Sequence, residues 1–191
     1  MEHTMFCFQC EQTAGCTGCT GRAGVCGKSA GTAKLQDELT GALIGLARAT
    51  DNAPGVNEDT WQLLIEGLFT TVTNVNFHDE TIRAMISRVH AEKSRLVPGC
   101  AACAAACGRT SDYDMAQLWD AQEDIRSLKS LVLFGVRGMA AYAHHAMVLG
   151  YTDETVNRFF AKALFAVGED WDMEQLLPIV MEVGEKNLRC M

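Results

Sequence analysis

The feature that most constrains this chain is a run of cysteines and glycines near its start. Five of its nine cysteines fall within twenty residues, and glycine stands at every third position from 15 to 27. These five are Cys7, Cys10, Cys16, Cys19 and Cys26. Such a segment does not sustain a helix or strand, because glycine loses more backbone freedom on folding than any other residue. It can fold tightly around a metal centre, so we expect residues 1–33 to form an irregular cluster-binding loop.

The spacing of these cysteines leaves three interpretations. A zinc site could use the C-x2-C-x5-C-x2-C pattern from Cys7 to Cys19, but zinc modules usually separate their cysteine pairs by a dozen residues or more, and Cys26 would be left over. Disulfides would leave one of the five cysteines over and would need an oxidising compartment. An iron–sulfur cluster needs four thiolates from one compact loop, and it is the interpretation that the spacing favours.

Charge and hydropathy argue against several classes of protein. The 191 residues carry 16 basic and 24 acidic side chains, a net charge of −8, whereas a nucleic-acid or anionic-membrane binder needs a basic face. No apolar run approaches the roughly 18 residues that a transmembrane helix needs, and the first residues lack the pattern of a secretory signal. We therefore expect a cytoplasmic protein that binds neither nucleic acid nor membrane.

Apolar residues beyond residue 34 recur at spacings of three and four, which predicts an all-α fold. The segments around Gly45-Leu46-Ala47 and Gly138-Met139-Ala140 resemble each other, and so do the helical patterns that follow them. We predict two three-helix bundles related by internal duplication, joined by a cysteine-containing connecting loop. The bundles cover 34–97 and 121–191, and the connecting loop covers 98–120. In the first bundle the expected helices cover 34–49, start near Asp59, and cover Asp79–Leu96. In the second bundle the first expected helix covers 121–149, the next starts after Thr152 or Asp153, and the last starts after Asp172.

The connecting loop holds a second group of cysteines. Cys100, Cys103 and Cys107 would share one face of a short helix. The interpretation that we favour is that they are small apolar residues that let the helix pack closely. The alternative is a second metal site, with Cys190 as a distant fourth ligand.

Basic residues are the other polar feature of the N-terminal segment. Arg22, Lys28 and Lys34 outnumber the acidic residues of 1–34. They could stabilise an anionic cluster or help to dock a redox partner, and a solvated face is an equal alternative.

The cysteine motifs and two later segments resemble the hybrid-cluster proteins, also called prismane proteins or hydroxylamine reductases. The resemblance covers essentially the whole chain. Its leading motif is Met5-Phe6-Cys7-Phe8-Gln9-Cys10-Glu11-Gln12-Thr13, followed by Gly18-Cys19-Thr20 and Gly24-Val25-Cys26-Gly27-Lys28. The later segments run from Cys103 to Met115 and from Gly135 to Tyr151.

The resemblance implies a domain of two three-helix bundles with an oxygen-sensitive iron–sulfur cluster, 4Fe–4S or in some members 2Fe–2S. Residue by residue, it implies that Cys7, Cys10, Cys19 and Cys26 bind the cluster. Cys16 has no counterpart in the motif, and it is either a bystander or a substitute ligand.

The resemblance also implies a function, and here the length of the chain matters. Family members continue far beyond 191 residues, and the part that follows binds the hybrid cluster, through His, Glu and Cys ligands, where hydroxylamine or nitric oxide is reduced. The chain therefore resembles the N-terminal domain alone: a fragment, an engineered truncation or a short relative.

We expect electron transfer with a redox partner protein or a catalytic domain absent from this chain. The family is an oxidoreductase, but whether this chain is itself an enzyme stays open. An active site completed between chains of a homo-oligomer is a further option. The alternative function is a zinc-stabilised helical interaction module without redox activity.

Overall fold

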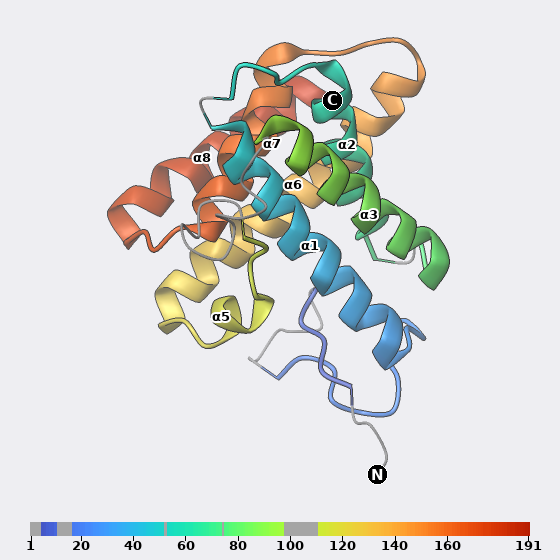
Figure 1. The fold of residues 1–191 in the computed structure, drawn as a ribbon. Helices are drawn as coiled ribbons and strands as arrows, with labels where there is room; N and C mark the ends of the chain where they lie inside the picture. The colour runs from blue at the N-terminus through green and yellow to red at the C-terminus, as the bar shows by residue number, and fades with distance from the viewer. Residues whose placement is uncertain (1–4, 11–16, 52, 74, 98–110) are drawn as a thin grey trace.

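The computed structural model describes residues 5–10, 17–51, 53–73, 75–97 and 111–191, and the regular elements in these ranges are all helices (Figure 1). They are α1 (Ala30–Thr50), α2 (Glu58–Thr70), α3 (Asp79–Leu96), α5 (Met115–Trp119), α6 (Glu123–Val148), α7 (Glu154–Gly168) and α8 (Met173–Cys190). The predicted all-α class is confirmed. The β pairing in the described ranges amounts to two isolated bridges, which join Cys7 to Cys19 and Ala23 to Ser29.

Side-chain caps determine where several helices begin. Asp153 and Asp172 accept hydrogen bonds from the first backbone N–H groups of α7 and α8, so these two predicted starts are confirmed. The start predicted for α1 is wrong by four residues. The Ser29 hydroxyl accepts a hydrogen bond from Thr32 N at 3.0 Å, so the helix begins at Ala30, inside the segment expected to be loop.

The helix α5 also differs from expectation, because it lies inside the predicted connecting loop. Its N-cap is Asp114, whose carboxylate accepts a hydrogen bond from Ala116 N at 3.0 Å. A helix of five residues is too short to show the apolar periodicity on which sequence prediction depends.

The two sets of three helices share one apolar core. α1 packs against α3 and α6 packs against α8, and α1 also contacts α7 while α2 contacts α6. Buried residues from both sets, including Leu43, Phe160 and Met139, belong to a single cluster. The matching pairs are what a duplication predicts, although the duplication and the domain boundaries themselves stay predictions.

The described part of the N-terminal segment, residues 5–10 and 17–29, is called the cysteine loop below. It lies beside the N-terminal half of α1, at the end of the molecule away from the C-terminus (Figure 1). The helices α1–α3 and α5–α8 are called the helical body. Within the described ranges, none of these helices combines the length and apolar character that a membrane crossing requires.

Candidate metal centre

Two of the predicted ligands are brought side by side by backbone pairing. Cys7 N donates to Cys19 O at 3.0 Å, and Cys19 N donates to Cys7 O at 2.8 Å. Gly18 makes this pairing possible, since its φ is +61° and a Cβ atom there would lie 2.8 Å from Cys7 O. The glycine before Cys19 is therefore required both by its backbone conformation and by the close approach of the Cys7 backbone.

A second turn holds Cys26. Gly27 N donates to Gly24 O and Gly24 N donates to Lys28 O, both at 2.9 Å. A Cβ atom on Gly24 would lie 3.3 Å from Cys26 Sγ, so the glycine leaves room for this sulfur. The turn leads through the Ala23–Ser29 bridge directly into the cap of α1.

Gln9, between Cys7 and Cys10, fixes their turn to α1. Its side chain is buried, and its Nε2 donates to Ala33 O at 2.9 Å and to Asp37 Oδ1 at 2.7 Å. Its Oε1 accepts a hydrogen bond from Lys28 Nζ at 2.6 Å. The turn that carries two cysteines is thus attached to the helical body through one buried amide.

The guanidinium of Arg137 reaches the same turn from α6. Its Nη1 donates to the backbone carbonyl of Gln9 at 3.2 Å, its Nη2 to Thr40 Oγ1 at 2.9 Å, and its Nε to Thr71 Oγ1 at 3.1 Å. Two hydroxyl groups, from α1 and from the end of α2, and one backbone carbonyl from the cysteine loop therefore accept hydrogen bonds from one arginine.

Burial dominates the electrostatics of this region. It raises the pKa of the Asp37 carboxyl to about 6 despite the hydrogen bond from Gln9, and it lowers the pKa of Arg137 to about 10. Burial also raises the pKa of the Cys7 thiol, against the hydrogen bond from the backbone N–H of Gln9 and the charge of Lys28, which both lower it. Each charged form here is costly unless an opposite charge lies close by.

The charge balance indicates what kind of group this region suits. Lys28 and Arg137 are 2% and 5% exposed, and Asp37 is the carboxylate whose charge acts on Arg137. Two enclosed cations therefore face one carboxylate whose own ionisation is disfavoured. Cluster thiolates carry negative charge and are stabilised by hydrogen bonds and cations around the sulfurs. In their charge, the residues present fit an anionic iron–sulfur cluster on this loop.

An aromatic group covers the Cys7 segment from one side. The rings of Phe6 and Phe8 lie 4.9 and 5.0 Å from the ring of Trp119, which ends α5. A groove of about 730 Å³ opens beside these rings, with Asp37 in its lining. The short helix α5 thus positions an apolar cover next to the candidate ligands.

The predicted ligands share one loop, but their sulfurs are not gathered. Cys7 is buried and Cys10, Cys19 and Cys26 are partly exposed. Within the described ranges, no three His, Cys, Asp or Glu side chains lie close enough together to hold a metal ion. The ligand set Cys7, Cys10, Cys19 and Cys26 therefore stays a prediction. Cys16, Cys100, Cys103 and Cys107 lie outside the described residues.

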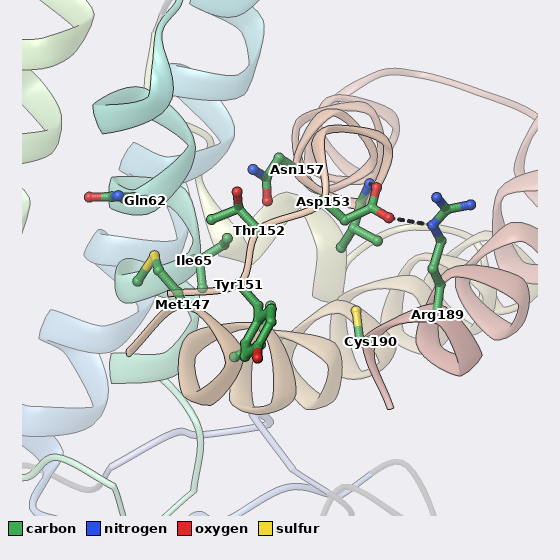
Figure 2. A pocket seen from close by; sticks show the side chains of 12 residues that line it. Gln62, Ile65, Met147, Tyr151, Thr152, Asp153, Asn157, Arg189 and Cys190 are labelled. Carbon is green, nitrogen blue, oxygen red and sulfur yellow. Dashed lines mark hydrogen bonds and ion pairs between the residues drawn. The ribbon is translucent and has the colours of Figure 1, made fainter. Parts of the chain in front are cut away.

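Cys190 lies far from the cysteine loop, at the end of α8. It lines a cavity of about 130 Å³ between α2, α7 and the end of α6, where Arg189 forms an ion pair with Asp153 (Figure 2). Burial and the nearby Asp153 charge raise the pKa of the Cys190 thiol. Cys190 is the predicted distant fourth ligand of a second metal site with Cys100, Cys103 and Cys107, and this stays a prediction because those three residues lie outside the described ones.

Sequence reasoning missed most of the side chains that hold the loop. Asp37 and Arg137 were not expected there, and the solvated alternative for Lys28 is wrong because Lys28 is buried. Arg137 leaves a readable signal, since it lies at helical spacing between Leu133 and Ala140 on the buried face of α6. A charged residue on an apolar face implies a buried polar partner.

Comparisons with known proteins give a consistent result. The sequence profile of the Prismane/CO dehydrogenase family matches residues 5–191. The hydroxylamine reductase of Methanococcus vannielii is 36% identical over 206 residues, which cover 95% of this chain and 37% of that protein. That of Maridesulfovibrio salexigens is 37% identical over 207 residues, covering 98% and 38%. The chain thus spans little more than a third of the length of these curated relatives.

Proposed function

The chain belongs to the Prismane/CO dehydrogenase family, and we propose that it is an iron–sulfur, electron-transferring part of a protein like the hydroxylamine reductases. The thiolates of Cys7, Cys10, Cys19 and Cys26 hold one cluster, of the 4Fe–4S type. The single observation that carries the proposal is the buried excess of positive charge beneath the Cys7–Cys10 turn, from Lys28 and Arg137.

The residues of the loop have separate tasks in this proposal. The Cys7–Cys19 backbone pair sets the spacing of two ligands, and Gly24 leaves space for the sulfur of Cys26. The backbone N–H of Gln9 donates a hydrogen bond to Cys7, which favours the thiolate form of this ligand. The rings of Phe6, Phe8 and Trp119 limit the access of water from one side.

When bound, the cluster accepts and releases one electron at a time. Four protein thiolates complete the coordination of such a cluster and leave no position for substrate, so the chain carries electrons rather than converting a substrate. The cluster held by Cys7, Cys10, Cys19 and Cys26 would supply electrons to a catalytic centre in another domain or protein. The chain spans 37% of the Methanococcus vannielii reductase, which leaves ample length in that relative for such a centre.

The test is anaerobic purification of this chain followed by iron, sulfide and zinc analysis and an absorption spectrum. We expect about four irons and four sulfides per chain and a broad visible absorption that bleaches on reduction with dithionite. Cys7→Ser and Cys26→Ser lose this absorption, whereas the matched control Cys190→Ser keeps it. A colourless chain that binds only zinc contradicts the proposal and supports the structural zinc module.

The choice between two neighbouring cysteines needs its own comparison. Cys19 pairs with Cys7 through the backbone, so Cys19→Ser is expected to remove the cluster while Cys16→Ser leaves it in place. The reverse result shows that Cys16 is the third ligand.

A further inference from the structure

Lys28 and Arg137 reach the same residue from distant parts of the chain. Lys28 Nζ donates to the side-chain oxygen of Gln9 at 2.6 Å, and Arg137 Nη1 donates to its backbone carbonyl at 3.2 Å. Lys28 belongs to the cysteine loop and Arg137 to the middle of α6. These two residues are called the cation pair below.

The cation pair is buried, and in the described part of the chain the carboxylate whose charge acts on both of its members is Asp37, which accepts a hydrogen bond from Gln9 Nε2 at 2.7 Å. Its hydrogen-bond acceptors there are Gln9, Thr40 and Thr71, all of which are uncharged. A buried cation that is held only by neutral acceptors is costly. The three hydrogen bonds that the guanidinium donates to three separate segments offset part of this cost.

A positive charge in a medium of low dielectric constant acts strongly on charges a few ångströms away. Both cations donate hydrogen bonds to Gln9, which stands between Cys7 and Cys10 in the chain, so both lie close to the group that these two cysteines would hold. The cation pair therefore interacts with any negative charge that is added to the group held by these two cysteines.

We propose that the cation pair, held in place through Gln9, sets the reduction potential of the cluster. This inference rests on the proposed function. Reduction adds one electron, supplied by an external donor, and makes the cluster more negative by one charge. The two fixed cations stabilise that reduced form more than the oxidised form, and they therefore raise the potential. Lys28 and Arg137 are not ligands in this role, and they act through their charge.

The test is a potentiometric titration of the loaded chain, followed by absorption and by electron paramagnetic resonance, with dithionite as reductant. In Arg137→Met and in Lys28→Met we expect the ratio of reduced to oxidised cluster at a fixed potential to fall at least tenfold. A tenfold change corresponds to 59 mV for a one-electron couple. Arg137→Lys keeps the charge and is expected to change the ratio less than threefold.

Arg158→Met is the matched control, since it removes the same charge from the exposed surface of α7, where Arg158 pairs with Glu154. We expect it to change the ratio less than twofold. If Lys28 and Arg137 only supported the fold, their Met variants would load less cluster, but the loaded fraction would keep the wild-type potential. That result overturns the inference.

The outcomes separate the two proposals. A wild-type chain that takes up no cluster contradicts the proposed function. The inference about the reduction potential then falls with it, because there is no cluster to titrate. A wild-type chain that loads the cluster, with both Met variants within twofold of its ratio, leaves the proposed function intact and overturns the role of the cation pair. Where circular dichroism shows that one Met variant does not fold, the other variant decides.

Discussion

The cysteine loop and the helical body are held together by different forces. The body is held by a continuous cluster of apolar side chains that both sets of helices share. The loop contributes Phe8 to that cluster and shares a small apolar cluster with Ala33 through Met5 and Cys7, and the rest of its attachment includes the buried polar contacts of Gln9. The body therefore does not depend on any single contact, whereas the loop depends on the identity of a few side chains.

This difference follows from the physics of the two kinds of contact. Apolar burial contributes roughly 25 cal/mol per Å² and has no directional requirement, so many apolar sequences satisfy it. A buried polar network needs every donor and acceptor in place, because an unsatisfied buried group costs more than the hydrogen bond contributes. In the cysteine loop, one substitution is therefore expected to change the binding of the cluster as well as the stability of the fold.

The largest expected effect lies in the body. Phe160 on α7 is fully buried in the shared core, and Phe160→Ala removes its ring without a replacement. We expect the free energy of unfolding to fall by about 3–5 kcal/mol. Urea denaturation followed by circular dichroism measures it.

The matched control for Phe160 is Leu177→Ala, whose side chain lies on the exposed face of α8 at 53% exposure. It is expected to change the free energy of unfolding by less than about 0.5 kcal/mol. Equal effects of the two substitutions would mean that the body is not held by its shared apolar core.

A smaller effect, which depends on pH, is expected where the loop joins the body. Burial raises the pKa of Asp37 from 3.8 to about 6 in the folded chain. Between about pH 4 and pH 6 the folded chain therefore keeps a proton that the unfolded chain has lost. The contribution of Asp37 to the free energy of unfolding consequently falls as the pH rises through this window and is constant above it. At 1.36 kcal/mol per pKa unit, the fall is about 3 kcal/mol.

Asp37→Asn removes this dependence and keeps an oxygen that accepts the hydrogen bond from Gln9. Urea denaturation of the cluster-free chain between pH 4 and pH 7 compares the two proteins. We expect the variant to gain about 3 kcal/mol on the wild type across this range. Glu38→Gln controls for the loss of one carboxylate from the neighbouring exposed position of α1. Parallel curves for wild type and Asp37→Asn contradict the prediction.

The same contrast explains how much of the structure the sequence predicts. Helices α3, α7 and α8 are predicted well, because apolar periodicity and caps such as Asp153 and Asp172 are local signals. The cysteines of the candidate site are equally visible as a motif. Arg137 is visible only as a charge on the buried face of α6, and its partners and Asp37 are not visible, since their place beside Gln9 depends on where α1 and α6 lie in the folded chain. Long-range polar contacts of this kind leave little local trace in a single sequence.

The smallest expected effect tests the loop backbone alone. Gly18 and Gly27 both have positive φ, +61° and +85°, which costs a residue with a side chain roughly 1–2 kcal/mol. A Cβ atom on Gly18 also meets Cys7 O at 2.8 Å, whereas nothing lies within 4 Å of one on Gly27.

We expect Gly18→Ala to open the Cys7–Cys19 pair and to speed hydrogen exchange of both amides. Gly27→Ala has only the cost of the positive φ, and we expect it to leave the hydrogen exchange of the Cys7 and Cys19 amides near the wild-type rate. Neither substitution is expected to change the helix content, because Gly18 and Gly27 lie outside the helices and outside the shared core. Similar exchange rates in the two variants would show that the close approach of Gly18 to Cys7 does not hold the ligand pair together.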